Sequence, residues 1–161
     1  MMSIVKGTME NFRDCKASLE NSVLRQVYFT DDIKTEMFLK EGFEKEEIYI
    51  AMDEKNICIG FIRIDWNFVF SNFPLLRVIA VKPECRGKGT GRRLLAFFEQ
   101  LSFERTTKVF LFVSQLNPRA RKLYDEMGYV IVGAVPGLYS NNGIVEFLMV
   151  KNNFQTMDPV I

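Results

Sequence analysis

The stretch Cys85-Arg86-Gly87-Lys88-Gly89-Thr90-Gly91-Arg92-Arg93-Leu94-Leu95 decides how the rest of this sequence is interpreted. An apolar run at 75–81 precedes it, and a helical pattern at 92–103 follows it. Three glycines and several cations therefore lie at a predicted strand-to-helix turn. Glycine lets the backbone approach a ligand closely, and a helix start offers unpaired N–H groups and the positive end of the helix dipole. The pattern indicates an anion site, most simply for phosphate.

Two familiar phosphate motifs do not fit this turn. No Gly-Lys-Ser/Thr ends it, as in a Walker loop, and its spacing is Gly-x-Gly-x-Gly from Gly87 instead of Gly-x-Gly-x-x-Gly. A flexible, solvated basic loop is the alternative interpretation. The strand and helix predicted on either side favour the anion site.

The bulk properties predict one domain, residues 1–161, because the length falls within the usual range for a single domain. Hydrophobic residues make up 48%, enough for a sizeable core. The net charge of +1 argues against a general nucleic-acid surface. The absence of His excludes histidine-based catalysis, and Cys15, Cys58 and Cys85 lack metal-like spacing, so no metal is expected.

The sequence also bears on where the protein is located. No apolar run approaches the ~20 residues that a membrane helix requires. Residues 1–14 are polar and charged, so no secretory signal is expected. Reduced thiols suit the cytoplasm, which is the predicted location.

The hydrophobic pattern predicts a mixed α/β chain. Strands are expected at 4–6, 48–52, 57–66, 75–81, 108–114, 129–135 and 145–151. Helices are expected at 9–19, at 31–42 with Gly42 ending the helix, at 92–103, and after a cap at Asn117. Residues 21–29 fit either a helix or a partly buried loop, 67–74 are expected to connect two strands, and 152–161 to form a weakly ordered tail.

Two motifs carry a resemblance to a known family. The turn is similar to the cofactor motif Arg/Gln-x-x-Gly-x-Gly/Ala of the GNAT superfamily, the acyl-CoA-dependent N-acetyltransferases, through Arg86, Gly89 and Gly91. The stretch 117–129 (Asn-Pro-Arg-Ala-Arg-Lys-Leu-Tyr-Asp-Glu-Met-Gly-Tyr) resembles the family's Asn-x-x-Ala-x-x-Leu/Phe-Tyr-x-x-x-Gly-Phe/Tyr. The motifs and their flanking strands cover roughly residues 57–151.

The resemblance implies the GNAT fold. This fold is a twisted, mostly antiparallel sheet flanked by helices, with a parallel pair of strands that splays open, here between 75–81 and 109–114. Acetyl-CoA would lie in that gap as a co-substrate. The connection at about 20–31 would wall the acceptor site, and acceptor choice would lie in the early helices and the loop 136–143.

The resemblance also implies roles for individual residues. Backbone amides from Gly87 to Arg92 would take the pyrophosphate, and the charges of Arg86 and Lys88 would strengthen the contact. The strand Ile79-Ala80-Val81 would pair with the pantetheine arm, and an amide of this strand, with Val81 the candidate, would hold the carbonyl oxygen. Asn117 would contact the pantetheine, and Arg121 or Lys122 the 3′-phosphate. The predicted cofactor-binding residues are Ile79, Ala80, Val81, Arg86, Gly87, Lys88, Gly89, Thr90, Gly91, Arg92, Asn117, Arg121 and Tyr124.

Tyr124 is the predicted catalytic residue, a general acid. A phenol remains protonated at pH 7 and can donate a proton to a departing thiolate. From helical spacing alone, a core tyrosine is the alternative. The match with the family motif favours catalysis.

The general base is where this sequence departs from many family members. The strand positions that often carry Glu or Asp correspond here to Arg77 or Val78 and to Phe112. Either Asp65 or Glu146 acts through water, or the acceptor is an amine of low pKa. An α-amino group with a pKa near ~8 is far more often neutral than a lysine near ~10.4.

Three functions follow. The first is an N-acetyltransferase that moves the acetyl group of acetyl-CoA to a primary amine by direct attack in a ternary complex. The second is a non-catalytic acyl-CoA-binding sensor or interaction domain. The third is another phosphate-ligand protein on an unrelated α/β fold. The expected partners are acetyl-CoA and an amine, with no nucleic acid and no membrane. Whether two copies of the chain form a homodimer is left open.

Overall fold

The structure is a computed structural model that describes residues 1–139 and 143–153. Hydrogen bonds link seven strands in the order β1-β2-β3-β4-β5-β7-β6. The described pairings are antiparallel except for the parallel pair of β4 and β5. The predicted fold class, a mostly antiparallel mixed sheet with one parallel pair and flanking helices, is therefore confirmed.

The chain divides into two compact units. Unit 1 comprises Met1–Ile64 and Arg77–Phe98, and unit 2 comprises Asp65–Leu76 and the described residues from Glu99 onward. The expectation of one domain over residues 1–161 stays a prediction.

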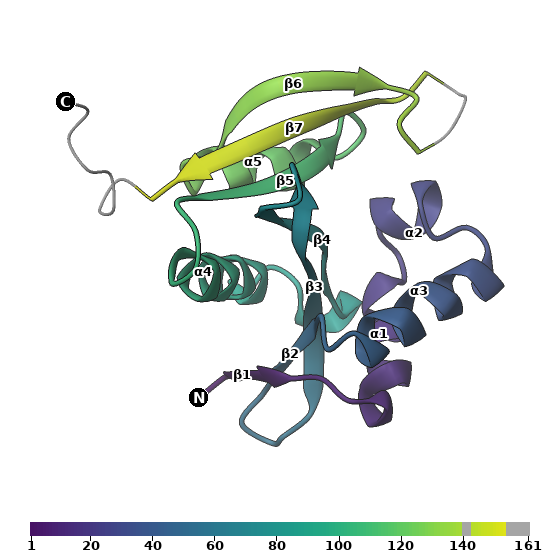
Figure 1. Cartoon of the computed structure of the whole chain (residues 1–161). Coiled ribbons are helices and arrows are strands. Elements are labelled where there is room, and N and C mark those ends of the chain that lie inside the picture. The colour runs from purple at the N-terminus through teal and green to yellow at the C-terminus, as the bar shows by residue number, and fades with distance from the viewer. Residues whose placement is uncertain (140–142, 154–161) are drawn as a thin grey trace. The chain divides into compact units, whose positions relative to one another are not determined.

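Unit 1 packs helices against both faces of its strands. Its elements are β1 (Ser3–Lys6), the 3-10 turn η1 (Met9–Asn11), α1 (Phe12–Leu19), α2 (Val23–Val27), α3 (Asp32–Glu44), β2 (Ile48–Met52), and the unit's parts of β3 (Cys58–Val69), β4 (Phe73–Val81) and α4 (Thr90–Phe103). The helices α1, α2 and α3 lie together beside β2 and β3 (Figure 1).

The side chains of β2 alternate between the two faces of the sheet, which explains this packing. Ile48 and Ile50 are buried in a cluster with residues of α1 and α3, whereas the Tyr49 ring lies 5.3 Å from the ring of Phe97 on α4. Successive side chains of a strand point to opposite faces, so one short strand serves both helical layers. The buried members of the cluster are Cys15, Leu19, Leu39, Phe43, Ile48, Ile50, Cys58, Phe61, Val78 and Ala80.

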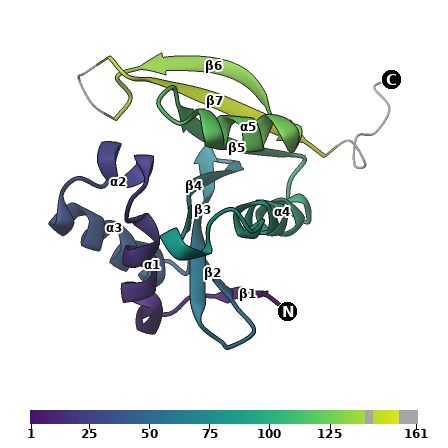
Figure 2. The same ribbon diagram turned by 180° about the vertical axis from the view of Figure 1, so that it is seen from behind.

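Unit 2 is built on β5 (Lys108–Ser114), β6 (Val130–Pro136) and β7 (Val145–Asn152), with α5 (Pro118–Glu126) against β5. Figure 2 shows α5 lying along this strand layer. The central strand β7 pairs antiparallel with β5 and with β6. Val69, Leu75, Phe110 and Val150 form its buried core cluster, against which Phe73, Phe112 and Leu148 pack.

The parallel pairing of β4 with β5 is short. It is described for Leu75 with Phe110 and Leu76 with Leu111, two registered pairs against the seven between β5 and β7. The splay expected farther along these strands stays a prediction.

Two predicted boundaries are wrong, both for tertiary reasons. The helix α3 runs through Gly42 to Glu44. A Cβ on Gly42 would lie 2.8 Å from Ile48 Cδ1, so this glycine provides close packing within the helix and does not end it. The connection predicted at 67–74 shrinks to three residues, because β3 extends to Val69 and β4 begins at Phe73.

The tight turn between β3 and β4 has no sequence signal. Phe70 and Ser71 both adopt left-handed backbone angles, φ 52 and φ 55, and the N–H of Asn72 donates to the Val69 carbonyl over 3.1 Å. Such hairpin turns favour Asn-Gly or Asp-Gly, so Phe-Ser gives no reason to expect one.

The remaining boundaries agree closely with the sequence. The ambiguous stretch 21–29 contains the five-residue helix α2, and α4 begins at Thr90, two residues earlier than expected. Asn152, assigned to the tail, belongs to β7. The rest of the predicted tail, 154–161, lies outside the described residues, as do residues 140–142 of the loop 136–143.

Candidate functional site

The glycine turn adopts the conformation that its sequence indicates. After β4, a short 3-10 turn, η2 (Pro83–Cys85), leads to Gly87 and Gly89, both with left-handed backbone angles, φ 75 and φ 82. The N–H of Arg93 donates to the Gly89 carbonyl over 3.1 Å, so Gly89 caps the start of α4. Both glycines allow angles that a side chain disfavours.

The turn exposes backbone at the start of a helix. Gly87, Lys88 and Gly89 are exposed, and a Cβ built on Gly89 would meet no atom within 4 Å. The first N–H groups of α4, from Thr90 to Arg92, belong to the set that a helix cannot pair internally. Open space, backbone N–H groups at a helix start and the positive end of the helix dipole suit a phosphate.

The two predicted cations of the turn have partners in unit 1. The Nζ atom of Lys88 donates to the Glu84 carbonyl over 3.3 Å. The Arg86 guanidinium donates to the backbone carbonyls of Val81, Asn21, Ser18 and Glu20. The predicted contact of either side chain with pyrophosphate stays a prediction.

The strand before the turn is held close to its neighbour. A Cβ on Gly60 of β3 would lie 2.7 Å from the Ala80 carbonyl oxygen, so only glycine fits there. Ala80 is buried, whereas Ile79 and Val81 are half-buried. The Val81 carbonyl accepts from Arg86 over 2.8 Å. The backbone roles predicted for these three residues are not tested by this geometry.

In unit 2, the second motif forms the capped helix that was predicted. The Asn117 side chain accepts a hydrogen bond from the Ala120 N–H over 3.2 Å, and Pro118 begins α5. The Arg121 guanidinium lies 5.1 Å from the centre of the Phe147 ring and 3.5 Å from Asp125. The cofactor contacts predicted for Asn117 and Arg121 stay predictions.

Tyr124 is buried on α5, with 5% of its surface exposed. Its ring centre lies 6.0 Å from that of Tyr129. Burial raises the pKa of Tyr124 above its ordinary value of 10, because the charged phenolate loses hydration. The phenol therefore stays protonated at neutral pH, as a general acid requires.

A group of polar side chains near Tyr124 was not singled out from the sequence. Glu99 of α4 is buried and pairs with Lys151 of β7 over 2.6 Å, and the Lys151 ammonium lies 5.9 Å from the Tyr129 ring centre. Burial, and then the negative charge of Glu99, raise the pKa of Tyr129. The only signal in the sequence was Tyr129 itself, which closes the second motif.

The positions expected for a general base hold other groups. Val78 is buried, and the Arg77 guanidinium lies 5.4 Å from the centre of the Phe38 ring. Phe112 packs edge-on against Tyr139, with ring centres 6.3 Å apart. Of the two alternatives, Asp65 accepts from the Asn67 N–H over 3.3 Å and Glu146 is 2% exposed. The identity of the base stays open.

Two features are absent from the part of the chain that the structure describes. Within residues 1–139 and 143–153, no group of three or more His, Cys, Asp or Glu side chains is arranged to hold a metal ion. In the same part of the chain, no helix is long and apolar enough to cross a membrane.

The sheet and the turn together define the class of protein: the fold is that of the acyl-CoA N-acyltransferases. A GNAT-family acetyltransferase from Bacillus cereus is similar, with a TM-score of 0.74 and 20% identity, covering 96% of this chain and 99% of that one. The protein YncA from Salmonella typhimurium, solved with its cofactor acetyl-CoA, is similar with a TM-score of 0.75 and 14% identity, covering 99% of this chain and 98% of that one. A spermidine N-acetyltransferase SpeG chimera from Vibrio cholerae and hSSAT has a TM-score of 0.73 and 20% identity, covering 94% of this chain and 95% of that one.

The chain belongs to the Acetyltransferase (GNAT) family, whose pattern matches residues 14–129. The resemblance drawn from the two motifs is thereby confirmed. An uncharacterised protein of Mycobacterium leprae is 38% identical over 74 residues, which make up 46% of this chain. The match spans 20% of that relative's length.

Proposed function

We propose that this chain is an acetyl-CoA-dependent N-acetyltransferase that acts on a primary amine. The observation that carries the proposal is the glycine turn, with left-handed Gly87 and Gly89 opening at the start of α4. In this proposal the amides from Gly87 to Arg92 bind the pyrophosphate, and Lys88 adds its charge. The backbone of Ile79, Ala80 and Val81 binds the pantetheine arm.

The proposed reaction is a direct attack. The neutral amine nitrogen forms a bond to the thioester carbonyl carbon, and the carbonyl oxygen becomes an oxyanion held by a strand amide, with Val81 the candidate. The C–S bond then breaks, and the coenzyme A thiolate takes a proton from Tyr124. The amide nitrogen loses one proton, and the tyrosinate regains one from solvent.

The environment of Tyr124 bears on this proton transfer. Burial raises the pKa of Tyr124, so donation to a solvated thiolate with a pKa near ~8.5 would be uphill. A thiol in an equally water-poor environment also has a raised pKa, so the pKa difference between Tyr124 and the leaving thiol becomes smaller. We therefore infer that proton transfer accompanies C–S cleavage in a site closed to water.

The acceptor in this proposal is an amine of low pKa. Arg77, Val78 and Phe112 supply no carboxylate where many family members carry their base. An α-amino group near pKa ~8 needs less help than a lysine near ~10.4. The same observation supports the second candidate, an acyl-CoA-binding domain without turnover.

The test starts with calorimetric titration of the full chain with acetyl-CoA, with ATP and NAD as controls. Selective binding of acetyl-CoA is expected, and preference for ATP or NAD would reject the proposal. Release of free coenzyme A thiol is then measured with three amines. These are a peptide with a free α-amino group, an N-terminally blocked lysine peptide, and spermidine, the substrate named for one structural neighbour. Thiol release with the α-amino peptide supports the enzyme, and binding without turnover of any amine supports the second candidate.

A further inference from the structure

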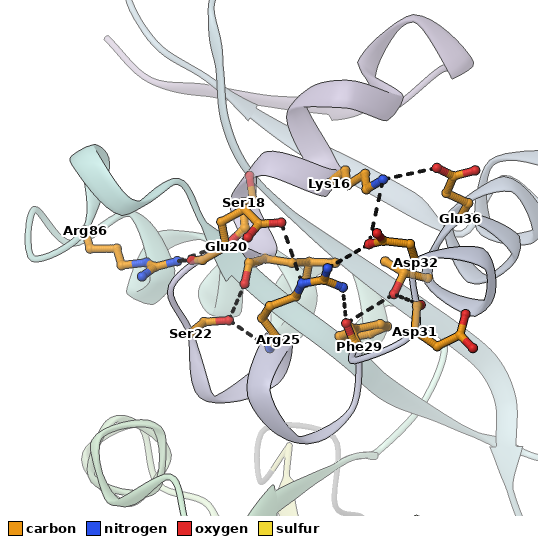
Figure 3. A network of polar contacts seen from close by, with 12 residues as sticks. Lys16, Ser18, Glu20, Ser22, Arg25, Phe29, Asp31, Asp32, Glu36 and Arg86 are labelled. Carbon is orange, nitrogen blue, oxygen red and sulfur yellow. Dashed lines mark hydrogen bonds and ion pairs between the residues drawn. The ribbon is translucent and has the colours of Figure 1, made fainter.

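The end of helix α1 is tied to the first residue of the glycine motif (Figure 3). The Arg86 guanidinium donates to four backbone carbonyl oxygens, three of them 65 to 68 residues earlier in the chain. The donor–acceptor distances are 2.8 Å to Val81, 2.6 Å to Asn21, 2.5 Å to Glu20 and 3.3 Å to Ser18.

The acceptors explain why an arginine suits this position. Ser18 belongs to the last turn of α1, Glu20 is the residue that ends the helix, and Asn21 has a left-handed backbone angle, φ 49. The last carbonyls of a helix lack partners within it and carry the negative end of its dipole. A guanidinium offers five donors in a planar fork, so it can join several of these carbonyls at once, which an ammonium cannot do with the same geometry.

A second cation from the same segment holds the start of α1. The Nζ atom of Lys82 lies 2.5 Å from Asp14 Oδ1, and Lys82 directly follows the last residue of β4. The segment from Val81 to Arg86 therefore contacts α1 in its first turn, through Lys82, and at its end, through Arg86. Gly87 follows this segment immediately.

Further polar contacts, made by Arg25, hold the connection between α1 and α3. Arg25 of α2 donates to the Phe29 carbonyl and, over 2.7 Å, to Asp32 Oδ1. Its Nε atom lies 3.7 Å from the Glu20 carboxylate. Ser22 caps α2 by accepting from the Arg25 N–H over 3.1 Å. Figure 3 shows these contacts joining residues 18–32 into one polar network, with Arg86 at its edge.

We propose that Arg86 is a positioning residue that couples the glycine turn to residues 18–31, the end of α1 and the connection that follows it. The proposal rests on the proposed function, in which the turn binds acetyl-CoA, and on the family resemblance, which implies that the connection at about 20–31 walls the acceptor site. Binding of acetyl-CoA at the turn restrains Arg86, and Arg86 restrains the carbonyls of 18–21. The charge of Arg86 thus serves the acceptor side more than the phosphates.

Hydrogen–deuterium exchange of the full chain tests this coupling. Arg86→Lys keeps the charge and loses the fork, so amide exchange over residues 18–31 should speed up about tenfold or more, because several hydrogen bonds to a charged group are lost. The matched control is Arg13→Lys, at an exposed position on α1, which should leave exchange unchanged. In the wild type, acetyl-CoA should slow exchange over 18–31, and Arg86→Lys should lose this effect while its acetyl-CoA Kd changes less than about threefold.

Kinetics add a readout that a purely structural role would not move. With whichever amine of the panel the wild type acetylates, Arg86→Lys should raise the amine KM more than it lowers kcat, whereas Lys88→Ala should raise the acetyl-CoA KM instead. Arg25→Lys acts on the same connection from α2 and should speed exchange over 18–31 as well. It keeps the proposal testable if the Arg86 variant does not fold.

The opposite results are equally clear. Unchanged exchange over 18–31 in both lysine variants would overturn the proposal. So would an acetyl-CoA Kd weakened about tenfold by Arg86→Lys with normal exchange, since Arg86 would then act on the phosphates. Failure of the proposed function is seen separately, as absence of acetyl-CoA binding by the wild type.

Discussion

The Arg63 guanidinium donates to the Glu47 carboxylate across 2.7 Å inside unit 1, where Arg63 has no exposed surface. The same guanidinium reaches Glu41 over 3.0 Å and the Phe38 carbonyl over 2.7 Å. It also lies 4.3 Å from the centre of the Phe38 ring. A buried charge is tolerated when such partners replace its water. This network joins β3 to α3 and to the residue before β2.

Removing one partner of this buried pair should be costly. Glu47→Ala leaves the Arg63 charge buried with fewer partners, and the free energy of unfolding should fall by about 3–5 kcal/mol. Urea unfolding followed by circular dichroism measures the change. Glu54→Ala is the control, because Glu54 makes an exposed ion pair with the N-terminus and should change stability far less. Equal effects of the two variants would show that Arg63 does not depend on Glu47.

Glu41 should make stability depend on pH in the acid range. Hydrogen bonds from Lys45 and then from Arg63 lower the pKa of Glu41 from 4.5 to about 2. The folded state binds this proton less readily than the unfolded state does. The stabilisation from Glu41 is therefore complete above pH 4.5 and is lost as the pH falls towards about 2.

Glu41→Gln should flatten the fall in unfolding free energy across that range. Its side chain is 47% exposed, so water and added salt should weaken the effect. Glu44→Gln, at an exposed position on the same helix, is the matched control. Urea titrations at several pH values measure how the unfolding free energy of each variant depends on pH. A pH dependence in Glu41→Gln equal to that of the wild type would contradict the role given to Glu41.

Gly89→Val should impair acetyl-CoA binding. The substitution places a branched side chain in the open space of the turn and forces φ 82 on a residue with a Cβ. The backbone strain lowers stability by about 1–2 kcal/mol, whereas the branched side chain fills the space that the pyrophosphate needs. Each 1.4 kcal/mol lost from binding is tenfold in Kd, and we expect the Kd from calorimetry to rise at least about tenfold.

A strained glycine outside the motif provides the control for this variant. Gly143 has φ 75 and equally open surroundings in the connection between β6 and β7. Gly143→Val should lower stability to a similar degree and leave acetyl-CoA affinity unchanged. Wild-type affinity in Gly89→Val would place the phosphate site elsewhere.

Tyr124→Phe should lower turnover by about 10²–10⁴, the usual contribution of a positioned general acid. Its acetyl-CoA Kd should stay within about threefold, since the ring and its packing are kept. Tyr129→Phe removes the hydroxyl of the neighbouring buried tyrosine and should leave kcat close to that of the wild type. Rate constants from single turnovers separate chemistry from product release. If both variants acetylate at the same rate, Tyr124 belongs to the packing alone.

The sequence by itself determined the features that depend on neighbouring residues. The glycine-rich stretch at 87–91 predicted a turn between a strand and a helix, and Asn117-Pro118 predicted the start of α5. The hydrophobic pattern predicted a strand at 108–114, which is β5. Each of these signals lies within a few residues, because backbone preference, capping and periodicity are local properties.

The tertiary structure decided what depends on distant residues. Gly42 lies inside α3 because Ile48 packs against it, and Phe70-Ser71 turns tightly although neither residue favours that conformation. Nothing in the sequence indicates that Arg63 is buried with Glu47 or that the Arg86 side chain donates to the carbonyls at 18–21. Their partners are 16 and 65 or more residues away, and no local pattern encodes such a distance. Only the folded chain brings these groups together, so the role of each cation follows from its partners and not from its type.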